Sequence, residues 1–252
     1  MTSPIRRPLI AGNWKMHLNL AQSVELAKAV RDGTVDSPAE VAVCVPYTAL
    51  TVAAEVLKGS HVRLGAQDLH WEAQGAFTGE VCAAQLVDAG ATHVIIGHSE
   101  RRRLFGETDE TVNKKLKAAL AAKLVPIVCV GETQDERQSN KTFRVLEIQM
   151  IGGLKGFAPA DLASVVVAYE PVWAIGTGVT ATPDQAQVAH LFLRKQAAKL
   201  YGEGFAAGLR ILYGGSVTAE NVDALMTQPD LDGAQLAGVE RDSLHRRHHL
   251  HA

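Results

Sequence analysis

The chain has 252 residues, of which 47% are hydrophobic, and its 25 basic and 27 acidic residues give a formal net charge of −2. This length suits two small domains or one α/β barrel, and the apolar content can fill a large core. The balanced charge argues against nucleic acid or a membrane surface as the main partner. No apolar run approaches the ~18 residues of a membrane span, and Pro8 interrupts any signal-peptide core, so we expect a cytoplasmic protein.

Short apolar runs, typical of buried parallel strands, recur along the whole chain. They cover residues 8–11, 41–45, 61–66, 93–97, 125–130, 165–169, 209–213 and 233–237. Longer stretches with helical character lie between them, such as residues 20–31, 107–123 and 184–201. Thr48, Thr108 and Thr182 stand near expected helix beginnings, and Pro183 suits a first helical position.

Eight strands that alternate with helices predict a parallel sheet. Eight such units in about 250 residues match the size of a closed (β/α)8 barrel, so we expect residues 1–252 to form a single domain. An open, doubly wound sheet is the alternative. The chain has no Gly-x-Gly-x-x-Gly motif between its first strand and first helix, which argues against a dinucleotide-binding version of that sheet.

The three cysteines give no sign of a metal site. Cys44, Cys82 and Cys129 are far apart and lack the paired spacing of metal ligands. Each lies in or beside an apolar segment, which favours reduced and partly buried thiols in a cytosolic protein.

Glu170 is the first ionisable residue after the sixth predicted strand, so it should lie at the carboxyl end of that strand, where parallel α/β folds carry their chemistry. The next stretch reads Pro171-Val172-Trp173-Ala174-Ile175-Gly176-Thr177-Gly178. Stiff ends around an apolar tip are typical of a hinged lid. A carboxylate beneath a lid that excludes water suits a base that abstracts a proton.

Other polar residues follow other strands, and a barrel would bring them to the same face. Asn13 and Lys15, two residues apart on an extended chain, would both point into the barrel mouth, where an ammonium suits a phosphate or a developing oxyanion. A solvated Lys15 is the alternative. His98 would face the start of a helix, whose partial positive charge favours a neutral imidazole that donates to a substrate carbonyl. Glu100 is either a second acid or base, or a partner of Lys15 or a nearby arginine.

The last two strands are followed by small residues. Gly214, Gly215 and Ser216 come after the seventh strand, and Gly238 comes after the eighth. They form either a simple tight turn or a place where backbone N–H groups approach a phosphate. In a barrel, the loops after strands seven and eight are a common phosphate site.

Five motifs, in this order, resemble the triosephosphate isomerase family: AGNWKM at residues 11–16, GAFTGE at 75–80, GHSERR at 97–102, AYEPVWAIGTG at 168–178 and YGGSV at 213–217. The resemblance extends from about Leu9 to Gly238. It implies a TIM barrel and an isomerase of glycolysis and gluconeogenesis. Such an enzyme interconverts dihydroxyacetone phosphate and glyceraldehyde 3-phosphate, with no cofactor or metal.

The same resemblance implies roles for single residues. Glu170 would move a proton between C1 and C2, while a neutral His98 would polarise the carbonyl. Lys15 and Asn13 would stabilise the enediolate and hold the substrate. The backbone of Gly176, Ser216 and Gly238 would hold the phosphate beneath the lid. The family is usually a homodimer, in which the loop at residues 67–80 reaches into the partner and places Thr78 near its active site.

The chain departs from the family pattern in three places. Val179 stands where many members carry lysine, and Ala237 stands where the first of two adjacent glycines is usual. Residues 239–252 are histidine-rich and lack the expected amphipathic helix, so we expect a frayed tail, weaker phosphate binding and lower stability. Another sugar-phosphate isomerase or aldolase, and a barrel reduced to a scaffold, are the rival interpretations.

Overall fold

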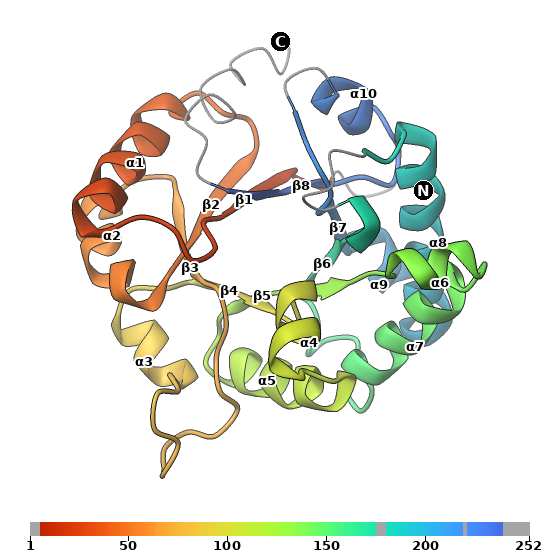
Figure 1. The fold of residues 1–252 in the computed structure, drawn as a ribbon, viewed down its shortest axis with the longest axis horizontal. Coiled ribbons are helices and arrows are strands. Elements are labelled where there is room, and N and C mark those ends of the chain that lie inside the picture. Colours follow the sequence, from red (N-terminus) through yellow and green to blue (C-terminus); the bar gives the residue numbers. More distant parts are fainter. Residues whose placement is uncertain (1–5, 175–179, 219–220, 239–252) are drawn as a thin grey trace.

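The computed structural model describes residues 6–174, 180–218 and 221–238, and its strands close into a barrel (Figure 1). The strands are β1 (Leu9–Asn13), β2 (Glu40–Val45), β3 (Arg63–Ala66), β4 (His93–Ile96), β5 (Val125–Val130), β6 (Val166–Tyr169), β7 (Arg210–Tyr213) and β8 (Gly233–Ala237). Each strand pairs in parallel with the next, and β1 also pairs with β8. This closure confirms the (β/α)8 barrel and excludes the open sheet.

Helices surround the strands (Figure 1). They are α1 (Leu20–Gly33), α2 (Leu50–Leu57), α3 (Ala83–Asp88), α4 (Ser99–Phe105), α5 (Asp109–Ala121), α6 (Gln134–Gln138), α7 (Thr142–Leu154), α8 (Pro183–Tyr201), α9 (Glu203–Gly208) and α10 (Val222–Met226). Two short 3-10 turns are η1 (Tyr47–Ala49) and η2 (Val172–Ala174). The helix predicted over residues 107–123 is shorter than expected, because Thr108 caps its start and the backbone at Lys123 is left-handed, with a φ of 60°.

Local sequence signals explain where the longest helix begins. The hydroxyl of Thr182 accepts the N–H of Gln185 at 3.2 Å, and Pro183 occupies the first turn of α8. Such a cap satisfies an N–H group that has no partner within the helix. Thr48, by contrast, lies inside η1 and does not cap α2, whose N-cap is Ala49.

Alternation along the strands divides the apolar residues into two layers. One cluster fills the barrel interior and includes Ala168, whereas the larger cluster between strands and helices includes Tyr169. Successive side chains of a strand point to opposite faces. Glu170, two residues after Ala168, therefore belongs to the interior side, at the mouth of the barrel.

Two other expectations concern cysteines and membranes. Cys44 and Cys129 are buried, Cys82 is half-buried, and all three are unpaired. Within the described ranges, no helix is both long and apolar enough to cross a bilayer. The tail at residues 239–252 lies outside the described residues.

Candidate active site

Glu170 is the centre of the site at the carboxyl ends of the strands. It directly follows β6, and only 2% of its surface is exposed. Its Oε1 lies 2.9 Å from Nε2 of His98, and its Oε2 accepts the backbone N–H of Ser99 at 2.8 Å. The two residues that the sequence analysis placed after strands four and six are therefore in direct contact.

His98 follows β4 and is the N-cap of α4, as expected. Its Nδ1 accepts the backbone N–H of Glu100 at 3.2 Å. An Nδ1 that accepts a hydrogen bond carries no proton, so the proton of the neutral ring is assigned to Nε2, which donates it to Glu170.

The electrostatics of this pair differ in part from the expectation. Burial raises the pKa of Glu170, but His98 and the Ser99 N–H together outweigh burial, and the pKa lies below its usual value. Burial lowers the pKa of His98, yet the Glu170 carboxylate outweighs it and the pKa is raised. The prediction of a lowered His98 pKa is therefore wrong for this arrangement. The helix N-terminus disfavours the charged imidazole, but the fold places the Glu170 carboxylate against the ring, and this carboxylate favours the charged form.

Lys15 reaches the site by a different backbone path from the predicted one. Its φ of 49° is left-handed, so the chain is not extended after β1. Oδ1 of Asn13 accepts the Lys15 N–H at 2.9 Å, and Gln67 donates to the Lys15 carbonyl at 2.9 Å, which together hold this turn. The Lys15 ammonium lies 2.6 Å from the carboxylate of Glu100. Of the roles considered for Glu100, pairing with Lys15 is the one seen in the structure.

A cavity of about 210 Å³ lies beside these residues. Its lining combines predicted site residues with others from the first loops of the barrel: Asn13, Lys15, Met16, Tyr47, Gln67, Asp68, His98, Glu100, Arg101 and Phe105. Gln67 was not predicted as a site residue. Gln67 comes directly after the third apolar run, so the rule that identified Glu170 would also have identified Gln67.

The glycines after β7 and β8 have different environments. A Cβ on Gly214 would lie 2.9 Å from Cγ of Glu170, so this glycine lets the chain pack against the carboxylate. Ser216 is half-buried in the same turn. The Gly238 N–H, however, donates to the Asn13 carbonyl at 3.0 Å, so it has a partner within the protein in this structure.

The first part of the predicted lid is a 3-10 turn that follows Pro171. The indole N–H of Trp173 donates to Oε1 of Glu132 at 2.9 Å. Glu132 is fully buried and also accepts the hydroxyl of Tyr169 at 3.1 Å. Glu132 was not predicted as a site residue, and its partners Tyr169 and Trp173 come from a distant strand and loop. Ile175, Gly176, Thr177, Gly178 and Val179 lie outside the described residues.

The described residues contain no group of three His, Cys, Asp or Glu side chains that could hold a metal ion. A buried carboxylate against a histidine, with a lysine nearby at the carboxyl ends of the strands, defines a (β/α)8 barrel with an acid–base site.

Comparisons with known proteins identify the family. The model of the triosephosphate isomerase family matches residues 8–244, and the chain belongs to this family. It is 55% identical to triosephosphate isomerase of Citrifermentans bemidjiense, over 93% of this chain and 94% of that one. It is 52% identical to the enzyme of Moorella thermoacetica, over 95% and 96%. A crystal structure of triosephosphate isomerase from Bartonella henselae aligns with a TM-score of 0.86 and 37% identity, over 95% of this chain and 97% of that one.

Proposed function

We propose that this chain is an isomerase that interconverts dihydroxyacetone phosphate and glyceraldehyde 3-phosphate by proton transfer through an enediolate. The observation that carries the proposal is the buried Glu170, whose pKa lies below its usual value, at the mouth of a barrel of this family. Its carboxylate is therefore in the basic form at neutral pH, as the abstraction of a proton from carbon requires.

Glu170 and His98 have complementary roles in this proposal. Glu170 takes the proton from C1 and returns it at C2, which requires its oxygens to leave Ser99 and His98 for the substrate. His98 then donates its Nε2 proton to the carbonyl oxygen at C2 and takes the hydroxyl proton at C1 in return, so the ring is neutral again, while the Glu100 N–H keeps Nδ1 as an acceptor. Once Glu170 has moved away, the main influence that raises the pKa of His98 is gone, and the neutral ring is favoured.

Lys15 and the glycine turns bind the charged parts of the substrate. The Lys15 ammonium, already drawn toward the site by Glu100, stabilises the enediolate oxygen and the phosphate, and Asn13 fixes its backbone. Ser216, Gly238 and Gly176 supply backbone N–H groups to the phosphate, beneath the lid at residues 171–178. For Gly238 this requires release of its hydrogen bond to Asn13, so we expect the β8 turn to change when phosphate binds.

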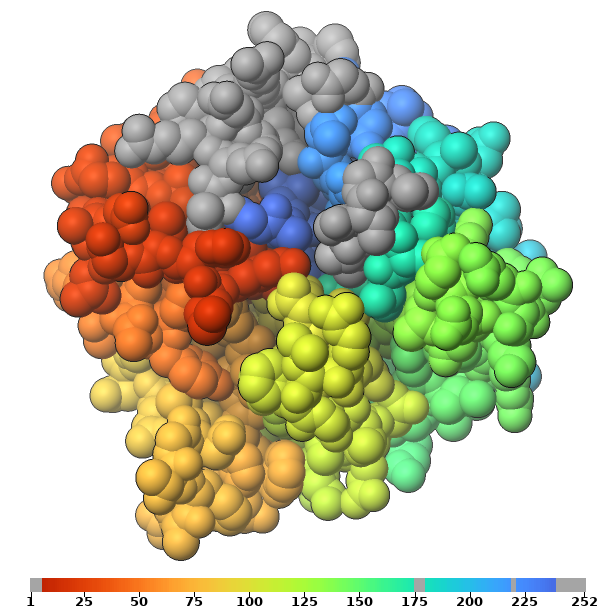
Figure 2. All heavy atoms as spheres, in the orientation of Figure 1, coloured from red at the N-terminus to blue at the C-terminus, as the bar shows by residue number. Residues whose placement is uncertain are grey.

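We also propose a homodimer and a cytoplasmic location. Residues 72–80 in the loop between β3 and α3 are exposed and project from the rim of the barrel (Figures 1 and 2). This loop carries Thr78, and Phe77 within it is 42% exposed. Met16 and Phe105, at the cavity of about 210 Å³, are 95% and 66% exposed. The exposed Phe77 on the loop of one copy and the exposed apolar side chains of Met16 and Phe105 at the cavity of another suit each other.

Replacement of Glu170 tests the function. Glu170→Gln keeps the shape of the side chain but removes the base, so we expect kcat for glyceraldehyde 3-phosphate to fall by at least about 1,000-fold. Glu55→Gln, on the exposed side of α2, is the matched control and should keep normal turnover. A wild-type protein without isomerase activity would refute the function, and near-normal turnover of Glu170→Gln would move the base role to another group.

The rival aldolase interpretation has a structural weakness. An aldolase that forms a Schiff base needs a lysine on a central strand. None of the residues in β1–β8 is a lysine, and the buried Lys115 lies on α5, where its ammonium is paired with Asp68 at 2.6 Å.

A further inference from the structure

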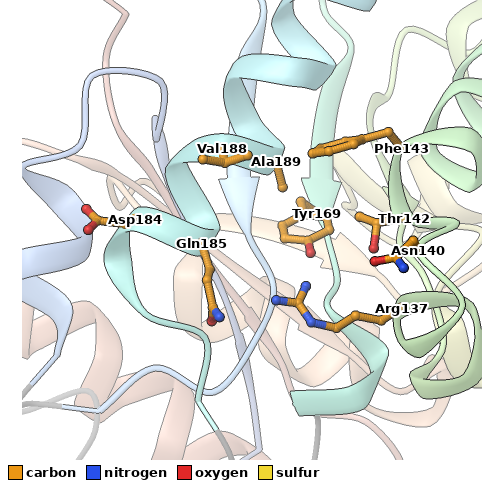
Figure 3. A pocket seen from close by; sticks show the side chains of 9 residues that line it. All are labelled: Arg137, Asn140, Thr142, Phe143, Tyr169, Asp184, Gln185, Val188 and Ala189. Carbon is orange, nitrogen blue, oxygen red and sulfur yellow. The ribbon is translucent and has the colours of Figure 1, made fainter.

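A second cavity, of about 580 Å³, lies outside the barrel, between the turn that joins α6 to α7 and the start of α8 (Figure 3). Tyr169 contributes to its lining, whereas Glu170, the next residue, turns toward the barrel interior. Among the residues that the structure describes, none lines both this cavity and the one beside Lys15 and His98. The two cavities are therefore separate sites.

One end of this cavity is apolar and partly exposed. Phe143 and Val188 are 44% and 53% exposed, although large apolar side chains gain free energy when water is excluded from them. The Phe143 ring is fixed by Phe192, with centroids 4.7 Å apart. Figure 3 shows Phe143 and Val188 at one end of the cavity and Arg137 at the other. The apolar end suits a flat hydrophobic group.

The other end offers hydrogen-bond donors. Gln185 uses its Oε1 to accept the Thr182 N–H at 3.1 Å, which leaves the amide NH2 as the group it can offer. Arg137 uses Nη1 for Glu132 at 3.2 Å, and its guanidinium has further N–H groups. Asn140 adds a third polar side chain at the same end (Figure 3). A ligand that reaches this end therefore needs an acceptor oxygen or nitrogen.

The charges indicate that the ligand is neutral. The positive charge of Arg137 is already matched by the buried carboxylate of Glu132, and Asp184 adds a further carboxylate to the lining. The cavity thus has no excess positive charge with which to repay the desolvation of an anion. The Glu132 carboxylate is already paired with Arg137, and Asp184 lies apart from Arg137 and Asn140 (Figure 3), so among the described residues no group of free carboxylates favours a cation.

We propose that this cavity binds a neutral, planar aromatic molecule that carries a hydrogen-bond acceptor such as a carbonyl group. The ring lies against Phe143 and Val188, and the acceptor faces Arg137, Asn140 and Gln185. This inference does not rest on the proposed isomerase function, since no residue of the acid–base site takes part in it.

Binding of a ligand in the cavity should change the surroundings of the Trp173 indole. Oε1 of Glu132 accepts hydrogen bonds from three cavity residues, Arg137 at 3.2 Å, Tyr169 at 3.1 Å and Thr142 at 3.4 Å. It also accepts the Trp173 indole N–H at 2.9 Å. The Arg137 guanidinium also lies 4.1 Å from the centroid of the Trp173 ring. A ligand that draws on Arg137 therefore changes both the hydrogen bond and the ring contact of Trp173.

Indole N–H spectra of the intact protein, recorded by NMR during titration with benzamide, test the proposal. We expect the Trp173 signal, assigned with Trp173→Phe, to shift saturably, while the signals of Trp14 and Trp71 stay in place. Val188→Glu removes part of the apolar wall and should weaken binding on the order of tenfold. Leu191→Glu, on the same helix, 38% exposed and outside the cavity, is the control and should bind as the wild type does.

Three outcomes would overturn the proposal. The first is a titration without a saturable shift of the Trp173 signal. The second is equal benzamide affinity in Val188→Glu and the wild type. The third is tighter binding of benzoate or benzylamine than of benzamide, which would assign the cavity to an ionic ligand. The readout needs no turnover, so its failure is distinct from failure of the isomerase function.

Discussion

At the scale of single residues, Glu170 combines two opposing influences. Burial at 2% exposure disfavours its charge, while His98 and the Ser99 N–H favour it, and the second influence prevails. The basicity of Glu170 in the free enzyme is therefore set by neighbours that it must leave during catalysis.

The pH dependence of His98→Asn tests this balance. The carboxylate of Glu170 must be ionised to act, so activity falls as the pH drops through its pKa. In the variant burial remains but the histidine is lost, so the pKa of Glu170 should rise and the acidic limb of the kcat/KM profile should move to higher pH. The profile for glyceraldehyde 3-phosphate gives the limb directly. An unmoved limb would mean that His98 does not set the charge of Glu170.

His190 links a buried residue to the acid stability of the fold. It is fully buried between Tyr169 and Tyr213, and burial lowers its pKa to about 3. The unfolded chain, with a histidine pKa of about 6.5, binds the proton first as the pH falls. The folded state therefore loses stability below about pH 6.5, by about 2 kcal/mol at pH 5 from this residue alone.

His190→Phe removes this titration. We expect the free energy of unfolding of the variant, measured with denaturant, to fall less between about pH 7 and pH 5 than that of the wild type, by about 2 kcal/mol. The variant also loses the contact of Nδ1 with the Asp230 carbonyl, so its stability at neutral pH can be lower. The test compares how steeply the free energy of unfolding changes with pH in the variant and in the wild type. Equal slopes would contradict the prediction.

At the scale of elements, the end of β8 differs from its expected behaviour. Ala237 is the last residue of the strand and is exposed, and it is not among the residues with positive φ. Gly238 has a φ of 99°, and no described atom apart from its chain neighbours lies within 4 Å of the place of a Cβ. This turn therefore requires glycine at position 238, because of the positive φ there, and does not require it at position 237.

Two single substitutions separate these positions. Gly238→Ala should lower the free energy of unfolding by roughly 1–3 kcal/mol, because alanine rarely adopts this backbone conformation. It should also raise KM, since the same turn is proposed to hold the phosphate. Ala237→Gly should change both quantities little. A larger gain in affinity from Ala237→Gly than loss from Gly238→Ala would restore the idea that Ala237 weakens phosphate binding.

The elements themselves were largely readable from the sequence, because each buried strand is a short apolar run and several runs are followed, directly or after one glycine, by a polar residue. That rule identified Glu170, His98 and Asn13. It failed where distant contacts decide local structure. The left-handed turn at Lys15 depends on a hydrogen bond from Gln67, 52 residues away. The role of Glu132 becomes visible only in the fold, where it accepts hydrogen bonds from Tyr169 and Trp173. The start of β3 was also misplaced, since His61 contacts the Thr34 hydroxyl at 2.8 Å instead of joining the sheet.

At the scale of the whole molecule, the protruding loop between β3 and α3 exposes the large apolar side chain of Phe77, which a monomer has little reason to do. Its residues 72–80 are all exposed, and its Phe77 contacts the His70 ring of the same loop. On the same chain, Met16 and Phe105 remain exposed at a cavity that also contains Lys15 and Glu100. If the loop of a second copy enters this cavity, assembly and the position of the Lys15 ammonium are connected.

Thr78→Arg tests that connection. A bulky charged side chain at the exposed loop should oppose entry into a cavity of only about 210 Å³, where its charge would be desolvated and the carboxylates of Glu100 and Asp68 are already paired with Lys15 and Arg101. We expect sedimentation to show a shift from dimer toward monomer, and kcat to fall as dimer is lost, since Lys15 and Glu100 lose a packed neighbour. Ser164→Arg, at an exposed position just before β6, is the control and should leave both unchanged. A Thr78→Arg protein that stays dimeric with full activity would show that this loop does not make the interface. A monomer with full activity would show that the interface forms there without supporting the position of Lys15.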